Sequence, residues 1–147
     1  MNTSTPDILV VGGAGYIGSH VVKALRDAGR QPVIFDNLST GLRENLFPEI
    51  PFIHGDLLIP EQIRAAMRGI RSVIHLAALK DAGDSMLEPE RYALHNLNGT
   101  VNLLHAAGTE GVRHFIFSSS AAVYGEPQYL PLDENHPTEP ANFYGQT

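Results

Sequence analysis

Short apolar segments alternate with longer segments of helical periodicity along this chain of 147 residues. The apolar segments are residues 8–11, 33–35, 52–54, 72–76 and 114–117. The first of them has no polar residue at alternate positions, which is typical of a strand covered on both faces. This alternation predicts parallel strands joined by crossover helices. We therefore expect an α/β fold with a doubly wound parallel sheet that ends after about five strands.

Three segments between the apolar runs have the spacing of helices. The first begins at Tyr16 and ends before Gly29, a typical residue just beyond a helix C-terminus. The second spans residues 60–68, and the third and longest spans about 88–107. In the first helix the side chains expected to face the core are Ile17, Val21, Leu25 and Ala28. In the third helix they are Tyr92, Leu97, Val101 and Leu104.

The sequence changes character at about residue 125. Residues 1–125 contain all the predicted strands, whereas residues 126–140 contain four prolines, which disfavour regular structure and predict an extended surface loop. Residues 141–147 look like the first turn of another helix. Helix nucleation is costly and an isolated turn rarely persists, so we expect this end of the chain to be disordered.

Composition excludes several classes of function. The chain has 10 Lys and Arg against 16 Asp and Glu, for a net charge of −6, which argues against a nucleic-acid or acidic membrane surface. Its apolar runs are far shorter than the roughly 20 residues that cross a bilayer. It has no cysteine and no recognisable secretory leader, which indicates a cytoplasmic protein. The seven histidines have no metal-binding spacing, so we expect no metal site.

A glycine-rich turn lies between the first predicted strand and the first predicted helix. Gly12 would permit the tight turn, Gly15 would let a pyrophosphate approach the backbone, and Gly18 would let the helix pack closely on the strand. The N-terminus of the helix would then hold the ligand's negative charge. The alternative is an ordinary glycine-rich connection, but the surrounding strand and helix patterns favour a dinucleotide site.

Two carboxylates follow the next two strands. Asp36 lies 18 residues beyond Gly18, where a carboxylate can bind both hydroxyls of an adenosine ribose. Because a 2′-phosphate would be repelled there, this position favours NAD over NADP as the cofactor. The alternative role of Asp36 is an Asx turn at the start of a loop. Asp56 could accept a hydrogen bond from the adenine amino group or be a solvated turn residue.

Five segments together resemble the extended short-chain dehydrogenase/reductase family, and more narrowly the UDP-glucose (UDP-galactose) 4-epimerases. These segments are residues 12–20, 36–37, 79–85, 96–100 and 117–125. The resemblance covers nearly the whole chain and implies a Rossmann-type fold. It also implies an NAD cofactor that removes and returns a hydride at C4 of a UDP-hexose, as in galactose metabolism. The cofactor contacts that it implies, together with the two carboxylates and the glycines above, are Gly12, Gly15, Tyr16, Ile17, Gly18, Asp36, Asn37, Asp56, Leu57, Leu76, Ala77, Ala78, Lys80 and Ser118.

The resemblance also assigns catalytic roles. Ser120 and Tyr144 occupy the positions of the family's catalytic serine and tyrosine. The lysine of the family's Tyr-x-x-x-Lys motif, which lowers the pKa of the tyrosine, would be residue 148, beyond the last residue given. With the substrate-binding domain also absent, we expect a cofactor-binding fragment that is inactive alone. Ser120 could instead bond loose backbone groups, and Lys80 could be a solvated loop residue.

Other functions remain open at this point. A UDP-glucuronate epimerase or decarboxylase is one alternative, and a non-catalytic dinucleotide-binding module is another. A sugar dehydratase is disfavoured, because Ala121 and Ala122 stand where such enzymes have an acidic pair. Ala122, His95 and Ala78 depart from the epimerase pattern and leave the sugar undecided. The resemblance implies a UDP-sugar substrate and a homodimer, with helix 88–107 in the dimer interface.

Overall fold

The structure is a computed structural model that describes residues 6–147. The described chain divides into two compact units. The first contains the residues up to Ala77 together with Gly99–Ser118, and the second contains Ala78–Asn98 and Ser119–Thr147. Among the described residues, none of the helices has the length and apolar character that crossing a bilayer would require.

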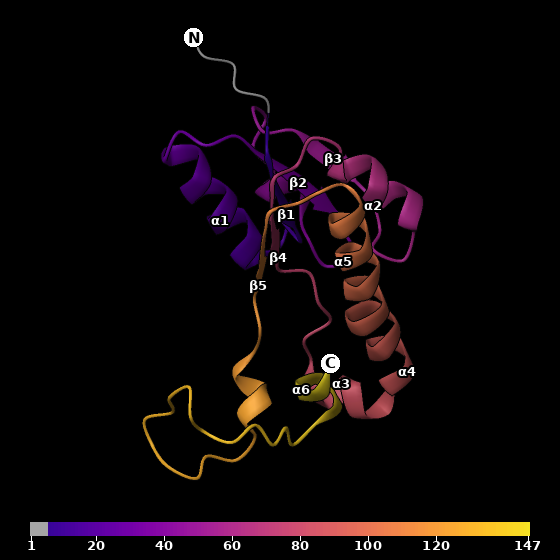
Figure 1. The fold of residues 1–147 in the computed structure, drawn as a ribbon. Coiled ribbons are helices and arrows are strands. Elements are labelled where there is room, and N and C mark those ends of the chain that lie inside the picture. Colours follow the sequence, from indigo (N-terminus) through magenta and orange to yellow (C-terminus); the bar gives the residue numbers. More distant parts are fainter. Residues whose placement is uncertain (1–5) are drawn as a thin grey trace. The chain divides into compact units, whose positions relative to one another are not determined.

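A parallel sheet forms the centre of the first unit (Figure 1). Its strands are β1 (Ile8–Val11), β2 (Pro32–Asp36), β3 (Phe52–His54), β4 (Ser72–His75) and β5 (His114–Phe117), in the order β3-β2-β1-β4-β5. Every neighbouring pair is parallel, and Val11 is in register with Phe35 on one side and His75 on the other. The five predicted strands and the doubly wound α/β fold are confirmed, with strand ends within one residue of the prediction.

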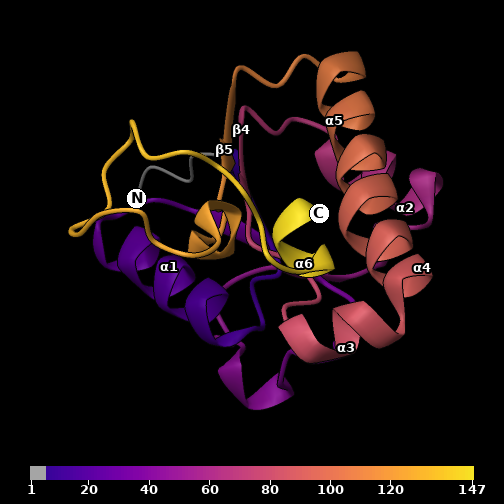
Figure 2. The same ribbon diagram turned by 90° about the horizontal axis from the view of Figure 1, so that it is seen from below.

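Helices cover both faces of this sheet. Helix α1 (Tyr16–Asp27) packs on the face that carries Val10 and Ile34, while α2 (Pro60–Met67) and α5 (Gly99–Thr109) pack on the opposite face. Figure 1 shows α1 on one side of the strands and α2 with α5 on the other, and Figure 2 shows the same layers from below. Both faces of β1 are buried, which explains its uninterrupted apolar sequence.

Helix α1 confirms one part of the sequence analysis and corrects another. Its C-terminal cap is confirmed, because Gly29 has a φ of +73° and its N–H donates to the carbonyl of Arg26. Val21 and Leu25 pack on the core as predicted. Ile17 and Ala28 are exposed, so their assignment to the core was wrong. The buried side of the helix instead centres on Gly18, Ser19 and Val22.

The predicted long helix forms as three consecutive segments. These are α4 (Pro89–Tyr92), a π-helix η2 (Ala93–Asn98) and α5, which belongs to the first unit. Tyr92 is buried as predicted, but Leu97, Val101 and Leu104 are 42–62% exposed, so their assignment to the core was wrong. A π-helix contains more residues per turn than an α-helix, so a 3.6-residue period carried across it points to the wrong face. The buried side chains of α5 include Leu103, Ala106 and Ala107.

The second unit contains α3 (Ala82–Leu87), α4, η2, a 3₁₀ turn η3 (Ala121–Tyr124) and α6 (Phe143–Gln146). Helix α3 was not predicted, nor was a 3₁₀ turn at Arg43–Asn45 in the first unit. Residues 126–140 contain no helix or strand, as their prolines predicted. The expected disorder of residues 141–147 is wrong, because α6 forms there and Asn142 caps it.

Candidate functional site

The glycine-rich turn joins β1 to α1 at the carboxyl edge of the sheet. Gly12 has a φ of +82°, and its N–H donates to the carbonyl of Phe35 at 2.8 Å. A Cβ at this position would lie 2.7 Å from the backbone nitrogen of Ala77. Both the conformation and the close approach of the chain after β4 therefore require glycine here.

Gly18 brings α1 directly against the same turn. A Cβ at Gly18 would overlap the carbonyl oxygen of Gly12 and lie 2.7 Å from Cα of Gly13. No side chain of the described residues caps the N-terminus of α1, where Gly15 is the N-cap. The N–H groups of a helix's first turn lack partners within the helix and attract anions. Tyr16 and Ile17, in that first turn, are 80% and 60% exposed.

Asp36 ends β2 and contacts the glycine-rich turn. One carboxylate oxygen accepts the N–H of Ala14 at 3.0 Å, and the other accepts the N–H of Leu38 at 2.8 Å. The first bond confirms that the turn and this carboxylate lie together, and the second is the Asx turn considered as an alternative. A carboxylate can accept about four hydrogen bonds, so these two leave acceptor capacity for a ribose.

Asn37, Asp56 and Leu57 lie beside this carboxylate's strand. The side-chain amide of Asn37 donates to Asp56 at 3.0 Å, and the other oxygen of Asp56 accepts the N–H of Leu58 at 2.9 Å. Leu57 packs against the core, and its carbonyl accepts a hydrogen bond from Asn102. Asp56 is thus a turn residue, and a role in binding adenine stays a prediction.

The ends of β4 and β5 supply the remaining predicted cofactor residues of the first unit. The N–H of Leu76 donates to the carbonyl of Val11, and Ala77 follows against Gly12. The N–H of Ser118 donates to the carbonyl of His75 at 3.1 Å. These residues follow strand ends at the edge that carries the glycine-rich turn, which is where ligands bind in open α/β sheets.

His75 was considered in the sequence only as a metal ligand and set aside. It is 1% exposed on β4, and its Nε2 lies 2.9 Å from the hydroxyl oxygen of Thr100. The rings of Phe115 and Phe117 lie beside it, and its Nδ1 has no hydrogen-bond partner among the described residues. Burial lowers the pKa of His75 to about 4, so the ring is neutral at pH 7.

The second unit holds the two predicted catalytic side chains. Ser120 is the N-cap of η3, and its hydroxyl oxygen accepts the N–H of Ala122 at 3.2 Å. The alternative backbone role of this serine is therefore real, although its hydroxyl proton can still be donated. Tyr144 lies in α6, where a Cβ at Gly145 would come within 2.6 Å of the Ala122 carbonyl oxygen. The segments that carry Ser120 and Tyr144 thus pack against each other.

Ala78 and Lys80 belong to the second unit and are exposed. The side chain of Asn96 fixes the backbone between them. It accepts the N–H of Leu79 and donates to the carbonyl of Leu79, both at 2.9 Å. A second N–H of the same amide donates to the hydroxyl of Thr147. Asn96 was part of the family resemblance but was not predicted as a site residue.

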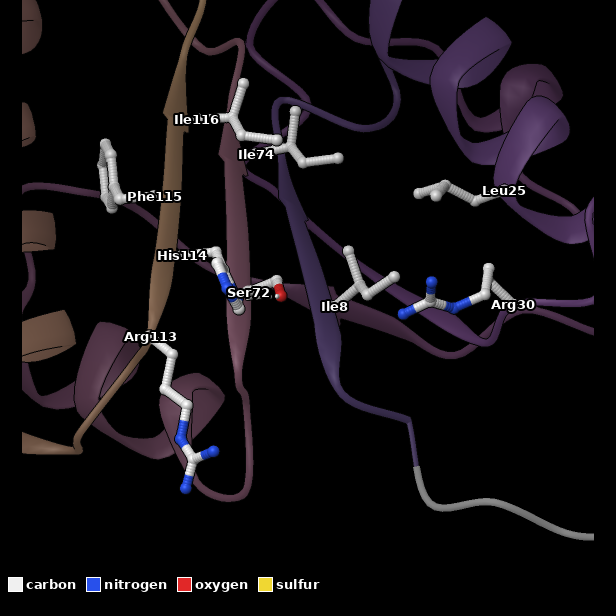
Figure 3. Close-up of a pocket in the computed structure, with 9 residues that line it drawn as sticks. All are labelled: Ile8, Leu25, Arg30, Ser72, Ile74, Arg113, His114, Phe115 and Ile116. Carbon is white, nitrogen blue, oxygen red and sulfur yellow. Dashed lines mark hydrogen bonds between the residues drawn. The ribbon is translucent and has the colours of Figure 1, made fainter.

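Two further features bear on ligand sites. Among residues 6–147, no three His, Asp or Glu side chains gather where they could hold a metal ion. A separate hollow in the first unit is lined by Ile8, Leu25, Arg30, Ser72, Ile74, Arg113, His114, Phe115 and Ile116 (Figure 3). Ile8, Ser72 and His114 are the first residues of their strands, so this hollow lies at the amino ends of the strands. It is not the predicted cofactor site, which is at their carboxyl ends.

A parallel sheet with a glycine-rich turn before an uncapped helix, and a carboxylate at the end of β2, defines a dinucleotide-binding α/β domain. The sequence matches the NAD dependent epimerase/dehydratase family over residues 8–147, so the chain belongs to this family. It is 44% identical over 140 residues to UDP-glucose 4-epimerase of Streptomyces lividans, covering 93% of this chain and 43% of that protein. It is 43% identical over 146 residues to the mouse (Mus musculus) UDP-glucose 4-epimerase, covering 89% and 42%.

Solved structures agree with this assignment. UDP-glucose 4-epimerase from Brucella ovis in complex with NAD superposes with a TM-score of 0.92 and 40% identity, over 97% of this chain and 44% of that one. The UDP-N-acetylglucosamine 4-epimerase from Methanobrevibacter ruminantium superposes with a TM-score of 0.89 and 36% identity, over 98% and 47%. The chain therefore spans less than half the length of the relatives that it matches.

Proposed function

We propose that this chain is the NAD-binding part of a nucleotide-sugar 4-epimerase of the UDP-glucose/UDP-galactose type. The observation that carries the proposal is the contact between Asp36 and the turn that precedes the uncapped N-terminus of α1. Membership of the NAD dependent epimerase/dehydratase family supports it, as do the names of the similar proteins.

The residues of the first unit fit NAD. The first-turn amides of α1 would hold the pyrophosphate, and Asp36 would accept hydrogen bonds from the adenosine ribose hydroxyls. When bound, NAD would supply the acceptor and donor of a hydride at C4 of a UDP-hexose. Tyr144 would take the proton from the sugar hydroxyl, and Ser120 would share that hydrogen bond.

Cofactor binding is tested by calorimetric titration of the 147-residue chain. We expect NAD to bind more tightly than NADP, because a 2′-phosphate would meet the charge of Asp36. Asp36→Asn should weaken NAD binding by about tenfold, the usual effect of losing one charged hydrogen bond. Asp27→Asn is a matched control, because Asp27 is an exposed carboxylate on α1 paired with Lys23. If wild type binds neither dinucleotide, the proposed function is wrong.

We infer that the 147-residue chain does not itself epimerise a sugar. A phenol with a pKa near 10 is a poor base at neutral pH unless positive charge stabilises its anion. The only lysines in the sequence are Lys23 and Lys80, and neither has the spacing of the family's Tyr-x-x-x-Lys motif to Tyr144. An assay with UDP-galactose should therefore show no turnover, and measurable epimerisation would contradict this inference.

We also infer that the chain associates with itself. Val101 and Leu104 are 62% and 48% exposed on α5, and Ile116 and Phe117 are 56% and 54% exposed on β5. Apolar surface of this kind favours association, and β5 has a strand neighbour on one side only in the described sheet. A homodimer through α5 is the association that the resemblance implies. Light scattering at high concentration tests this, because a clean monomer would contradict it.

A further inference from the structure

Side chains satisfy the N–H groups at the start of α6. The N–H of Phe143 donates to Sδ of Met86 at 3.3 Å, and the N–H of Tyr144 donates to Oγ of Ser85 at 3.0 Å. The N–H of Gly145 donates to Oδ1 of Asn142 at 2.8 Å. Two of these three acceptors come from adjacent residues of α3, nearly 60 residues earlier in the chain. Figure 2 shows α6 next to α3.

Ser85 makes the stronger of the two contacts from α3. It is fully buried, at 0% exposure, and its hydroxyl donates to the carbonyl of Ala82 at 2.6 Å. That bond uses the only proton of the hydroxyl, so toward other groups its oxygen acts as an acceptor. The Tyr144 N–H occupies one of those lone pairs. A thioether sulfur is a weak acceptor, so Met86 cannot replace this bond.

The N–H groups in the first turn of a helix have no acceptor within that helix, and Tyr144 lies in the first turn of α6. The position of the Tyr144 backbone therefore depends on contacts from outside α6, and the phenol is attached at the residue whose N–H Ser85 holds. Helix α3 begins two residues after Lys80, and the carboxylate of its N-cap Asp81 accepts the N–H of Asp84 at 2.9 Å. One short helix thus connects a predicted cofactor residue with the predicted catalytic tyrosine.

We propose that Ser85 is a positioning residue that sets the orientation of the Tyr144 phenol by holding the Tyr144 backbone N–H. This inference rests on the proposed function, in which Tyr144 moves the proton of the sugar hydroxyl. Ser85 touches neither cofactor nor sugar in this scheme and acts only through Tyr144.

The test uses the 147-residue chain and needs no ligand. Amide hydrogen exchange is measured by NMR in wild type, Ser85→Ala, Ser85→Thr and Met86→Leu, with Ser39→Ala as an exposed control. In Ser85→Ala the Tyr144 amide should exchange about tenfold faster or more, because its acceptor is lost. Ser85→Thr keeps a hydroxyl and should restore the wild-type rate. Met86→Leu should speed exchange at Phe143 rather than Tyr144, and the control should alter neither.

A second readout reports the side chain itself. Three-bond couplings give the χ1 rotamer populations of Tyr144, which should be a single rotamer in wild type and Ser85→Thr but an average in Ser85→Ala. If Ser85→Ala fails to fold, Ser85→Cys keeps a similar size with a weaker acceptor and should change both readouts in the same direction.

The outcomes separate this inference from the proposed function. An unprotected Tyr144 amide in wild type would overturn the role of Ser85, as would unchanged exchange in Ser85→Ala. Faster exchange with an unchanged Tyr144 rotamer would reduce Ser85 to a structural hydrogen bond and also overturn the proposal. Failure of the proposed function is seen elsewhere, as the absence of NAD binding in wild type.

Discussion

Lowering the pH from 6.5 to 4 should destabilise this protein through His75. The folded chain holds the His75 ring neutral down to about pH 4, because burial disfavours its charged form. The unfolded chain protonates the same ring near its ordinary pKa of 6.5. Between these values the unfolded state binds more protons than the folded state, so the free energy of unfolding must fall as the pH falls.

The size of the effect follows from the two pKa values. Each pKa unit corresponds to about 1.4 kcal/mol, so the difference between 6.5 and about 4 amounts to roughly 3 kcal/mol. That loss is a sizeable part of the stability of an ordinary small domain, which is about 5–15 kcal/mol. Above pH 6.5 this group should contribute no pH dependence.

Urea denaturation at a series of pH values measures this loss. His75→Gln removes the titrating ring but keeps an amide that can hydrogen-bond to Thr100, so its stability should fall less between pH 6.5 and pH 4. His105→Gln, at an exposed position on α5, is the control and should follow wild type. Hydrogen bonds lower the pKa of two carboxyl groups, from Lys23 and Arg26 at Asp27 and from a backbone N–H and then Arg26 at Glu49. These carboxylates are common to all variants and cancel in the comparison. Parallel curves for wild type and His75→Gln would refute the reasoning.

Three further outcomes are expected. Gly12→Ala should lower the free energy of unfolding by about 3 kcal/mol or more, because it combines a φ of +82° with a clash. Gly69→Ala, at φ +77° with no atom within 4 Å, should lower it by only about 1 kcal/mol. Equal losses in urea denaturation would show that the clash is not real. Asn142→Ala should remove the cap of α6 and cost about 1 kcal/mol in local stability, seen as faster amide exchange confined to that turn. Replacing Val101 and Leu104 by lysine should reduce self-association in sedimentation experiments without lowering the unfolding midpoint, because both side chains are exposed.

The strands could be predicted closely because their signals are local. Each is a short, mainly apolar run, and four of the five are followed directly by a polar residue or glycine. Burial on both faces of β1 leaves no polar residue within it. The cap at Gly29 was also readable, since a positive φ of +73° favours glycine. The contact of Asp36 with the glycine-rich turn followed from the rule that parallel strands place their carboxyl ends at one edge.

The errors have non-local or periodic causes. The start of α6 is supported by Ser85, a residue distant in the sequence, which accepts the Tyr144 N–H. No pattern within residues 141–147 indicates that hydrogen bond. The core-facing positions of the long helical region were wrong from Leu97 onward, because the π-helix η2 changes the number of residues per turn. A histidine inside the apolar segment 72–76 was a visible signal, and its burial at His75 could have been anticipated from that setting.

The sequence predicted the geometry of the candidate site better than the role of each residue in it. The structure confirms the contact between Asp36 and the turn, and the close packing at Gly12 and Gly18. It shows Asp56 and Ser120 in the backbone-bonding roles that the sequence analysis considered as alternatives. The ligand roles of these residues remain predictions, because they were inferred from sequence motifs and the ligands are not part of the chain.

The second unit consists of two stretches of chain, one following β4 and the other following β5, two strands that are neighbours in the sheet. All five strands, together with α1, α2 and α5, lie outside these stretches. Exchanging both stretches for those of another family member would therefore replace the predicted catalytic residues, and the predicted cofactor residues Ala78 and Lys80, while leaving the sheet and the glycine-rich turn unchanged. Chimaeras of two family members would therefore be joined between residues 77 and 78, 98 and 99, and 118 and 119, where the chain passes from one unit to the other.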